Sequence, residues 1–372
     1  MQLEQTIQRM NEKEQTIEIL EGQLKQMLPL SNEGAKGDSQ EYTDVTDINL
    51  TWRNGNPALQ GMYRECNAAV DKTTVYFNID SETRVYCYNS KNDLWTHVPE
   101  CQNQCSSFVF VDGLLTSIGG VDTEALHDMQ FSRSRSNEKG SQLSNKLYSL
   151  KERRWIENFP PMLMERASAT AVSTDSSLIV VGGKINWARH YYESVYRCHV
   201  EVMNITTQQW SVASSVPSNS DLHCASGVIC GDQLYVLGAK DSNRAYSCSL
   251  TDLLQSTTMR VSENIWRRIA DIPVLGSTCV SFYGHLLAIG GEEIDMRTRR
   301  RHTKHDSDNC GSTAVYAYNP TTKSWEVNSQ LSVARYNCFA VALPTTNELM
   351  VVDGKDAMYG PGIDSVEFAS MI

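Results

Sequence analysis

Residues 286–291 read Leu-Leu-Ala-Ile-Gly-Gly, and residues 315–325 read Val-Tyr-Ala-Tyr-Asn-Pro-Thr-Thr-Lys-Ser-Trp. The first stretch is a short apolar run that ends in two glycines. The second is rich in β-branched and aromatic residues, contains a turn and closes on a tryptophan. Short runs of this composition between turn residues predict β-strands. This stretch therefore predicts a unit of short strands joined by tight turns.

The same pattern recurs along the chain. The apolar run ending in glycine reappears at 114–120, 178–183 and 234–239, and in a weaker form at 349–354. Six tryptophans follow at intervals of 43 to 60 residues: Trp52, Trp95, Trp155, Trp210, Trp266 and Trp325. A tyrosine lies seven residues before three of them: Tyr88, Tyr148 and Tyr318. A fixed period of this length is the sequence signature of a repeat architecture.

Glycine pairs after an apolar strand, followed by a Val-Tyr-x-Tyr-Asn strand and a tryptophan, resemble the kelch repeat. The resemblance covers residues 50–372. It implies an all-β fold, a six-bladed kelch β-propeller in which each repeat forms a four-stranded blade. A single blade cannot bury both of its faces, so blades stack around an axis.

The ends of the repeat region predict how the ring closes. The last repeat stops after residues 365–369 without a tryptophan, whereas Trp52 has no glycine-ended strand before it. We expect residues 49–53 to supply the outer strand of the last blade, which removes two sheet edges.

Residues 1–29 differ in composition from the rest of the chain, because they are rich in Glu, Gln, Lys and Met, and they predict a helical coiled-coil segment. Ile17, Leu20, Leu24 and Met27 follow the spacing of a coiled-coil seam. The alternative is a solvated single helix, because so few turns are marginal alone. Residues 30–48 are polar and read as a flexible linker, which leaves residues 49–372 for the propeller.

Composition excludes several classes of protein. The formal net charge of −11 argues against a nucleic-acid binder that relies on a broad basic surface. The 11 cysteines are scattered, which favours free thiols in a reducing compartment over a disulfide framework. No apolar run is long enough for a membrane helix, and the polar N-terminus differs from a signal peptide. We therefore expect a cytoplasmic protein that binds no membrane.

Three arginines stand just before expected inner strands: Arg64, Arg166 and Arg335. Kelch-like substrate receptors of ubiquitin ligases often place arginines at the rim of the central channel. The resemblance implies that these three hold acidic groups of a partner through bidentate contacts. The alternative is that they pair with local carboxylates and orient neighbouring loops.

Two loops have compositions that suit binding. The segment 184–192 contains Trp187, Arg189 and Tyr191, residue types that dominate binding hot spots. Its alternative role is packing of Trp187 onto its own blade. The insertion 292–312 carries a basic run that includes Arg299, Arg300 and Arg301, which could meet an acidic protein segment or bind a nucleic acid nonspecifically. A solvated loop is the alternative. The histidines of this insertion have no second pair of ligands at the spacing of a metal site.

These features predict a non-enzymatic protein-protein interaction module, a scaffold or adaptor that binds a partner on the propeller face. The coiled coil would make a homodimer or join a hetero-oligomer. By family analogy the role could be that of a ubiquitin-ligase substrate receptor. The alternative is a propeller enzyme or small-ligand binder with a site in the central channel. The eight dispersed histidines and the absence of a nucleophile or phosphate-binding motif predict no catalytic residues, cofactor or metal.

Overall fold

The computed structural model describes residues 48–58, 66–79, 84–101, 103–104, 106–122, 145–149, 152, 154–185, 195–196, 198–217, 222, 224–239, 242–258, 264–295, 300–301, 311–356 and 362–372. The chain divides into two units, Met1–Thr43 and Asp44–Ile372. The predicted helix at 1–29 and all but residue 48 of the predicted linker lie outside the described residues.

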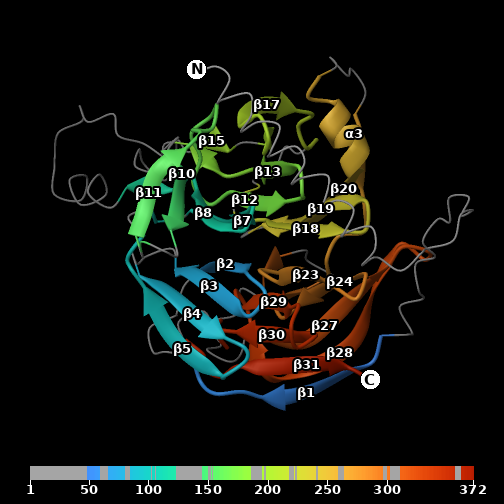
Figure 1. The fold of residues 1–372 in the computed structure, drawn as a ribbon. Helices are drawn as coiled ribbons and strands as arrows, with labels where there is room; N and C mark the ends of the chain where they lie inside the picture. Colours follow the sequence, from blue (N-terminus) through green and yellow to red (C-terminus); the bar gives the residue numbers. More distant parts are fainter. Residues whose placement is uncertain are drawn as a thin grey trace, which may run out of the picture. The chain divides into compact units, whose positions relative to one another are not determined.

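The described part of the second unit contains six antiparallel four-stranded sheets, the blades (Figure 1). Blade 1 holds β2 Cys66–Val70, β3 Thr74–Ile79, β4 Val85–Asn89 and β5 Leu94–Val98. Blade 2 holds β7 Ser107–Val111, β8 Leu114–Ile118, β10 Asn145–Ser149 and β11 Arg154–Phe159. Blade 3 holds β12 Thr170–Ser173, β13 Ser177–Val181, β16 Val200–Asn204 and β17 Gln209–Ala213.

The second half of the ring repeats this order. Blade 4 holds β18 Ser226–Cys230, β19 Gln233–Ala239, β20 Ser242–Ser249 and β21 Arg267–Arg268, with helix α3 Leu250–Gln255 before β21. Blade 5 holds β23 Thr278–Phe282, β24 His285–Ile289, β27 Ser312–Asn319 and β28 Ser324–Arg335. Blade 6 holds β29 Phe339–Leu343, β30 Glu348–Val352, β31 Glu367–Met371 and β1 Leu50–Asn54.

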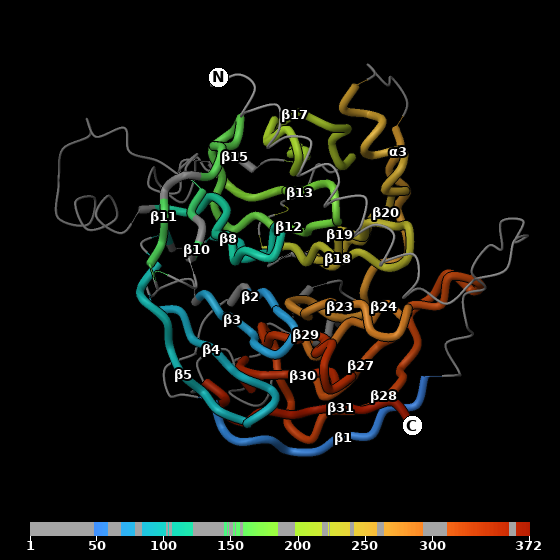
Figure 2. Tube along the Cα trace, in the orientation of Figure 1, coloured from blue at the N-terminus to red at the C-terminus, as the bar shows by residue number. Residues whose placement is uncertain are grey.

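The first strands of the blades surround the axis. Each is in contact with the first strand of the next blade, in the order β2, β7, β12, β18, β23, β29 and back to β2. The trace in Figure 2 follows this circuit from blue to red. The predicted all-β six-bladed propeller is therefore confirmed.

Packing between blades explains why the second strand of blade 3, β13, is almost entirely apolar. In β13, Leu178 and Val180 pack in the cluster shared with blade 2, whereas Ile179 and Val181 pack in the cluster shared with blade 4. Successive side chains of a strand point to opposite faces, so a strand with both faces buried is a continuous apolar run.

The tryptophan register has a repeated structural role. Tyr88, Tyr148 and Tyr318 lie opposite Trp95, Trp155 and Trp325 on the neighbouring strand, with ring centroids 5.0 to 5.2 Å apart. The indole N–H of four tryptophans also donates a hydrogen bond of 2.9 to 3.0 Å to a carbonyl of the preceding blade: Trp155 to Pro99, Trp210 to Pro160, Trp266 to Ser214 and Trp325 to Ala270. Each such tryptophan ties its blade to the one before it.

The N-terminal strand closes the ring as expected. Strand β1 pairs with β31 antiparallel, with Trp52 opposite Ala369. The guanidinium of Arg53 donates to both carboxylate oxygens of Glu348 at 2.9 and 3.0 Å. Both ends of the repeat region thus meet in blade 6.

No helix among the described residues is long and apolar enough to cross a membrane.

Candidate functional site

One face of the propeller carries the long connections. On this face the second strand of each blade ends and the first strand begins, as the pairing of Thr170 with Val181 and of Thr278 with Ile289 shows. The segments 123–144, 186–194 and 296–310 all follow second strands, so their anchors lie on this face, which we call the insertion face. Short strands extend the blades there: β6 Asn103–Gln104 with β9 Val121–Asp122, β14 Lys184–Ile185 with β15 Val195–Tyr196, and β22 Val274–Leu275 with β25 Glu292–Asp295 and β26 Arg300–Arg301.

Glycine pairs join neighbouring blades at the insertion face. A Cβ on Gly119 would lie 2.4 Å from the Arg166 carbonyl oxygen, and one on Gly290 would lie 2.5 Å from that of Arg335. Both glycines also have positive φ, so only glycine allows this close approach without strain. The following amides donate to the same carbonyls, Gly120 to Arg166 at 3.0 Å and Gly291 to Arg335 at 2.7 Å.

The side chain of Arg166 is completely buried in blade 3. Its Nη1 donates to the carbonyls of Gly182 at 2.8 Å and His199 at 3.0 Å, and its Nη2 lies 2.6 Å from Oε1 of Glu201. The other carboxylate oxygen of Glu201 accepts from the Leu163 amide at 2.7 Å. Because the Arg166 carbonyl also binds Gly120, this residue links the bases of the 123–144 and 186–194 connections.

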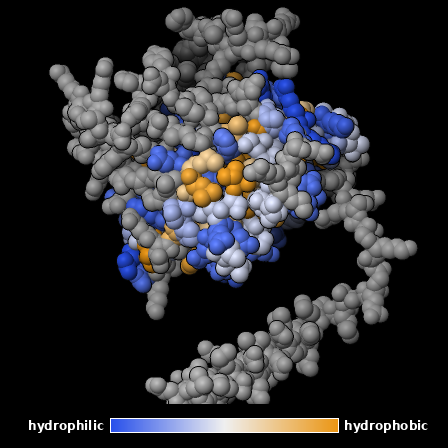
Figure 3. All heavy atoms as spheres, turned by 90° about the horizontal axis from the view of Figure 1, so that it is seen from above, coloured by the Kyte–Doolittle hydropathy of each residue, from blue (hydrophilic) through white to orange (hydrophobic). Residues whose placement is uncertain are grey.

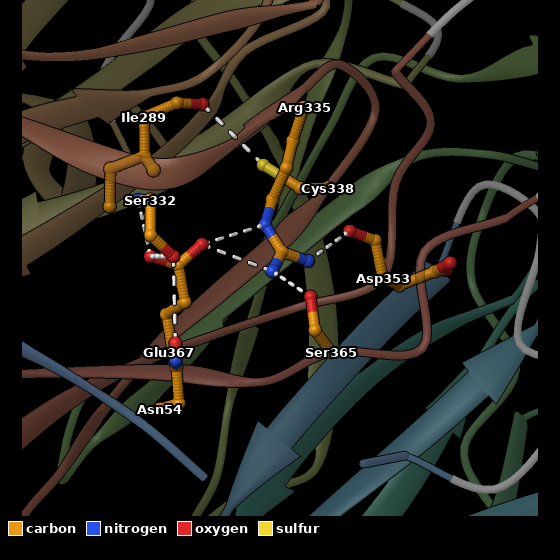
Figure 4. A network of polar contacts seen from close by, with 8 residues as sticks. All are labelled: Asn54, Ile289, Ser332, Arg335, Cys338, Asp353, Ser365 and Glu367. Carbon is orange, nitrogen blue, oxygen red and sulfur yellow. Dashed lines mark hydrogen bonds and ion pairs between the residues drawn. The ribbon is translucent and has the colours of Figure 1, made fainter.

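A second copy of this arrangement surrounds Arg335, the last residue of β28, whose side chain binds residues of blade 6 (Figure 4). The Arg335 guanidinium donates to the Asp353 carbonyl and to the Ser365 hydroxyl, each at 2.8 Å, and its Nη2 lies 3.1 Å from Glu367. Glu367 accepts from the amide and hydroxyl of Ser332 at 2.6 and 2.7 Å. In both copies the amide that binds the glutamate lies three residues before the arginine.

This geometry corrects the expectation that Arg166 and Arg335 hold an acidic partner. Both side chains are 0% exposed and paired with a buried glutamate. The Nη groups of both guanidiniums bind acceptors inside the protein, because an unpaired buried charge would be far too costly. The alternative stands for these two residues: they pair with local carboxylates and orient the neighbouring connections. Arg64 lies outside the described residues.

The glutamate partners were not identified from the sequence, although a signal for them exists. Glu201 stands in Val-Glu-Val-Met and Glu367 in Val-Glu-Phe-Ala, both within strands that read as buried. A charge in such a strand requires a buried partner. The arginine of the same repeat is the natural candidate for that partner.

Of the other residues expected to bind a partner, some lie outside the described residues and two form a strand. Trp187, Arg189, Tyr191 and Arg299 lie outside the described residues. Arg300 and Arg301 form β26, and their main chain pairs with Asp295 and Ile294 of β25. Part of the basic insertion is therefore a strand rather than a loop. Within the described ranges, no cluster of His, Cys, Asp and Glu is arranged to hold a metal ion.

A central cavity of about 330 Å³ runs between the first strands of the blades. Ser168, Cys224, Gly276 and Asn337 line it where β12, β18, β23 and β29 approach from the insertion face. The described lining contains neither the clustered histidines or carboxylates expected of a catalytic channel nor the arginines expected of an acidic-partner site.

Some small residues of the first strands also form hydrogen bonds to the next blade. The Thr170 hydroxyl accepts from the Gly227 amide at 2.8 Å, and the Ser107 hydroxyl accepts from the Ala171 amide at 3.0 Å. In each case a hydroxyl of one blade satisfies an inner-edge amide of the next blade. These bonds connect blades 2, 3 and 4 around the axis.

Two buried thiols line the same cavity. Burial raises the pKa of Cys279 to about 12, although hydrogen bonds to Ser277 and Ser226 act against the shift. Burial likewise raises the pKa of Cys338 to about 12, with Arg335 opposing it. Both thiols are therefore neutral at physiological pH, and the eight cysteines whose side chains are described form no disulfide.

Apolar side chains on the described surface are divided among several blades. Figure 3 shows apolar residues at several places among hydrophilic ones, with the most evident group near the centre of the view. The large exposed apolar residues are Leu94, Leu114, Leu163, Val212, Tyr283, Val327, Met371 and Ile372. Leu114 and Tyr283 lie in tight turns on the face opposite the insertion face.

Comparisons with known proteins agree with the fold. The Kelch motif family matches residues 165–217, which span blade 3 from Arg166 to Trp210. With the six blades, this match supports a kelch-repeat β-propeller. A solved structure described as "Structure of YjhT" is similar, with a TM-score of 0.62 and 17% identity over 83% of this chain and 95% of that chain. At that identity the likeness concerns the fold alone. No curated protein sequence matches this chain.

Proposed function

We propose that the chain is a non-enzymatic protein-binding module, a scaffold or adaptor that binds its partner on the insertion face. The observation that carries the proposal is the anchoring of three long connections around the mouth of one channel. Binding residues are commonly placed on loops held by a rigid scaffold. Arg166 and Arg335 supply that rigidity at the bases of these connections.

The direct test replaces two of the connections with short turns and asks which partners are lost. In two variants, residues 186–194 or 297–310 are replaced by short Gly-Ser turns, and proteins retained by each variant are identified by mass spectrometry. The control combines Leu114→Ser and Tyr283→Ser on the opposite face. We expect the exchanged variants to lose partners that the control keeps. Loss in the control alone, or an unchanged set of partners in all variants, would contradict the proposal.

Residues 1–29 add a proposed oligomerisation role. Two propellers on one coiled coil would raise the apparent affinity for a multivalent partner. Light scattering on the chain with and without residues 1–30 tests this role, and a monomer in both samples would refute it.

The role of ubiquitin-ligase substrate receptor is proposed on the family resemblance alone. It predicts that ubiquitin-ligase subunits co-purify with the chain. It also predicts that a partner lost from the 186–194 variant becomes more abundant in cells that express that variant.

A further inference from the structure

The closing strand β1 ends in a chemically labile pair of residues. Asn54 is its last residue, and with Gly55 it forms the only Asn-Gly pair of the chain. Asparagine is deamidated most readily before glycine, because no side chain hinders attack by the glycine nitrogen on the asparagine side chain. Asn54 is exposed, and its Oδ1 accepts a long bond of 3.5 Å from the Ser332 hydroxyl. Its side-chain amide is therefore loosely held and open to water.

Packing of the closed ring requires the glycine of this pair. A Cβ on Gly55 would lie 2.9 Å from Cδ2 of the Phe368 ring and closer still to Cε2. The ring is confined, because it is 1% exposed, lies 5.9 Å from the ring of Tyr88 and has the Arg53 guanidinium 4.3 Å from its centre. Closure between blades 6 and 1 thus imposes the labile pair on the sequence.

The same closure protects the pair from reaction. The Gly55 amide donates to the Val366 carbonyl at 2.8 Å, next to the pairing of Asn54 with Glu367. Attack requires this nitrogen to be released from its bond and turned toward the Asn54 side chain, which a paired, extended strand prevents. Proteins open locally at a smaller free-energy cost than that of global unfolding. Reaction is therefore confined to molecules in which the end of β1 has separated from β31.

We propose that Asn54 is a site of spontaneous deamidation that reacts when β1 opens, so that its modification records opening of the ring. In the open form the Gly55 nitrogen loses its proton to solvent and bonds to Cγ of Asn54. The bond from Cγ to the side-chain nitrogen breaks, and ammonia leaves. Water then opens the resulting five-membered succinimide at either carbonyl, which gives aspartate or isoaspartate. The net reaction consumes a water molecule and releases ammonia.

Either product weakens the closure. Aspartate at this position places a second carboxylate beside the Ser332 hydroxyl, which already donates to Glu367 at 2.7 Å (Figure 4). A hydroxyl has one hydrogen to donate, so the two carboxylates compete for it next to the Arg335–Glu367 pair. Isoaspartate adds a carbon to the main chain, so Gly55 can no longer pair with Val366 in register. Modification thus makes the opening harder to reverse.

The test follows deamidation of the full chain at physiological temperature and pH, by mass spectrometry of a fragment that contains residues 50–58. We expect Asn54 to react at least ~tenfold more slowly in the folded chain than in a synthetic peptide of these residues. Arg53→Ala, which removes a side chain that holds β1 to its neighbours, should raise the rate about fivefold in the chain. The same change in the peptide corrects for the chemical effect of the neighbouring residue. Arg268→Ala, in an exposed ion pair of blade 4, is the matched control and should leave the rate unchanged.

The consequence for the ring is measured on aged protein. The melting temperature of the parent should fall as isoaspartate accumulates, whereas Asn54→Gln, which cannot form the five-membered ring, should keep its melting temperature. Melting temperatures at the start establish that each variant is folded. Equal rates in the folded chain and the peptide, or a rate in the chain that Arg53→Ala does not raise, would overturn the inference. Isoaspartate at this position with an unchanged melting temperature would overturn it as well.

Discussion

Arg166 and Glu201 form an ion pair of 2.6 Å in which neither side chain is exposed to solvent. Arg335 and Glu367 repeat the pair in blade 6 with the same supporting bonds. The two blades lie three positions apart in a ring of six, so the pairs are on opposite sides of the axis. Each arginine ties a glycine turn of one blade to the third strand of the next blade.

Removal of one member of the pair should destabilise the propeller. Glu201→Leu leaves the Arg166 guanidinium buried without its counter-ion, for which we expect a loss of about 3–5 kcal/mol in the free energy of unfolding. Denaturant unfolding measures it. The double variant with Arg166→Met should recover much of the loss, because neither charge then remains.

The control is the exposed pair of Arg268 and Asp271, whose side chains are 56% and 38% exposed. Asp271→Ala should cost no more than about 1 kcal/mol, because solvent screens the attraction. A comparably small cost for Glu201→Leu would show that the buried pair does not brace the blades.

Loss of β1 should weaken the whole ring. A chain that begins at residue 57 lacks the ladder to β31 and the Arg53–Glu348 contact, which leaves β31 as an open edge. We expect its melting temperature to fall by at least ~5 °C, the effect of about 2 kcal/mol in a domain larger than 150 residues. A chain that begins at residue 44 keeps β1 and is the matched control. Equal melting temperatures for the two truncations would contradict closure through β1.

The bond between Thr170 and Gly227 can be tested with a nearly isosteric change. Thr170→Val keeps the shape but leaves the Gly227 amide without its acceptor, which we expect to cost about 1–3 kcal/mol. Thr207→Val, on an exposed turn, should stay within ~0.5 kcal/mol of the parent. If both variants unfold at the same denaturant concentration as the parent, the inner-edge bond contributes nothing.

Much of the fold could be predicted because each repeat carries its own markers. Trp52 had no strand before it and the last repeat had no tryptophan, and β1 pairs with β31 as those two gaps predicted. The coiled coil stays a prediction, since residues 1–29 lie outside the described residues.

The site was harder to predict, because its contacts join residues distant in sequence. Arg166 is separated from Glu201 by 35 positions in the sequence, and nothing local distinguishes an arginine held in the core from one at a solvent-exposed rim. The cavity mouth depends on Ser168 and Asn337, which belong to different blades. Only the closed ring brings such residues together.

The thiols of Cys279 and Cys338 line the cavity in their protonated form, which predicts a loss of stability at alkaline pH. Burial holds the pKa of Cys279 at about 12, whereas an unfolded cysteine titrates near ~8.5. Between these values the unfolded chain has lost a proton that the folded chain keeps. Stability therefore falls as pH rises, by about 1.4 kcal/mol per pH unit for one such thiol.

Cys279→Ala removes this titration and isolates its contribution. Urea unfolding at pH 7, 9, 10 and 11 should show a shallower decline in the variant than in the parent, by about 1.4 kcal/mol per pH unit above pH 9. Any packing loss from the smaller side chain is the same at every pH, so it shifts the curve without changing its slope. Parallel curves for variant and parent would mean that Cys279 ionises in the folded protein, and the cavity would then acquire a charge under mildly alkaline conditions.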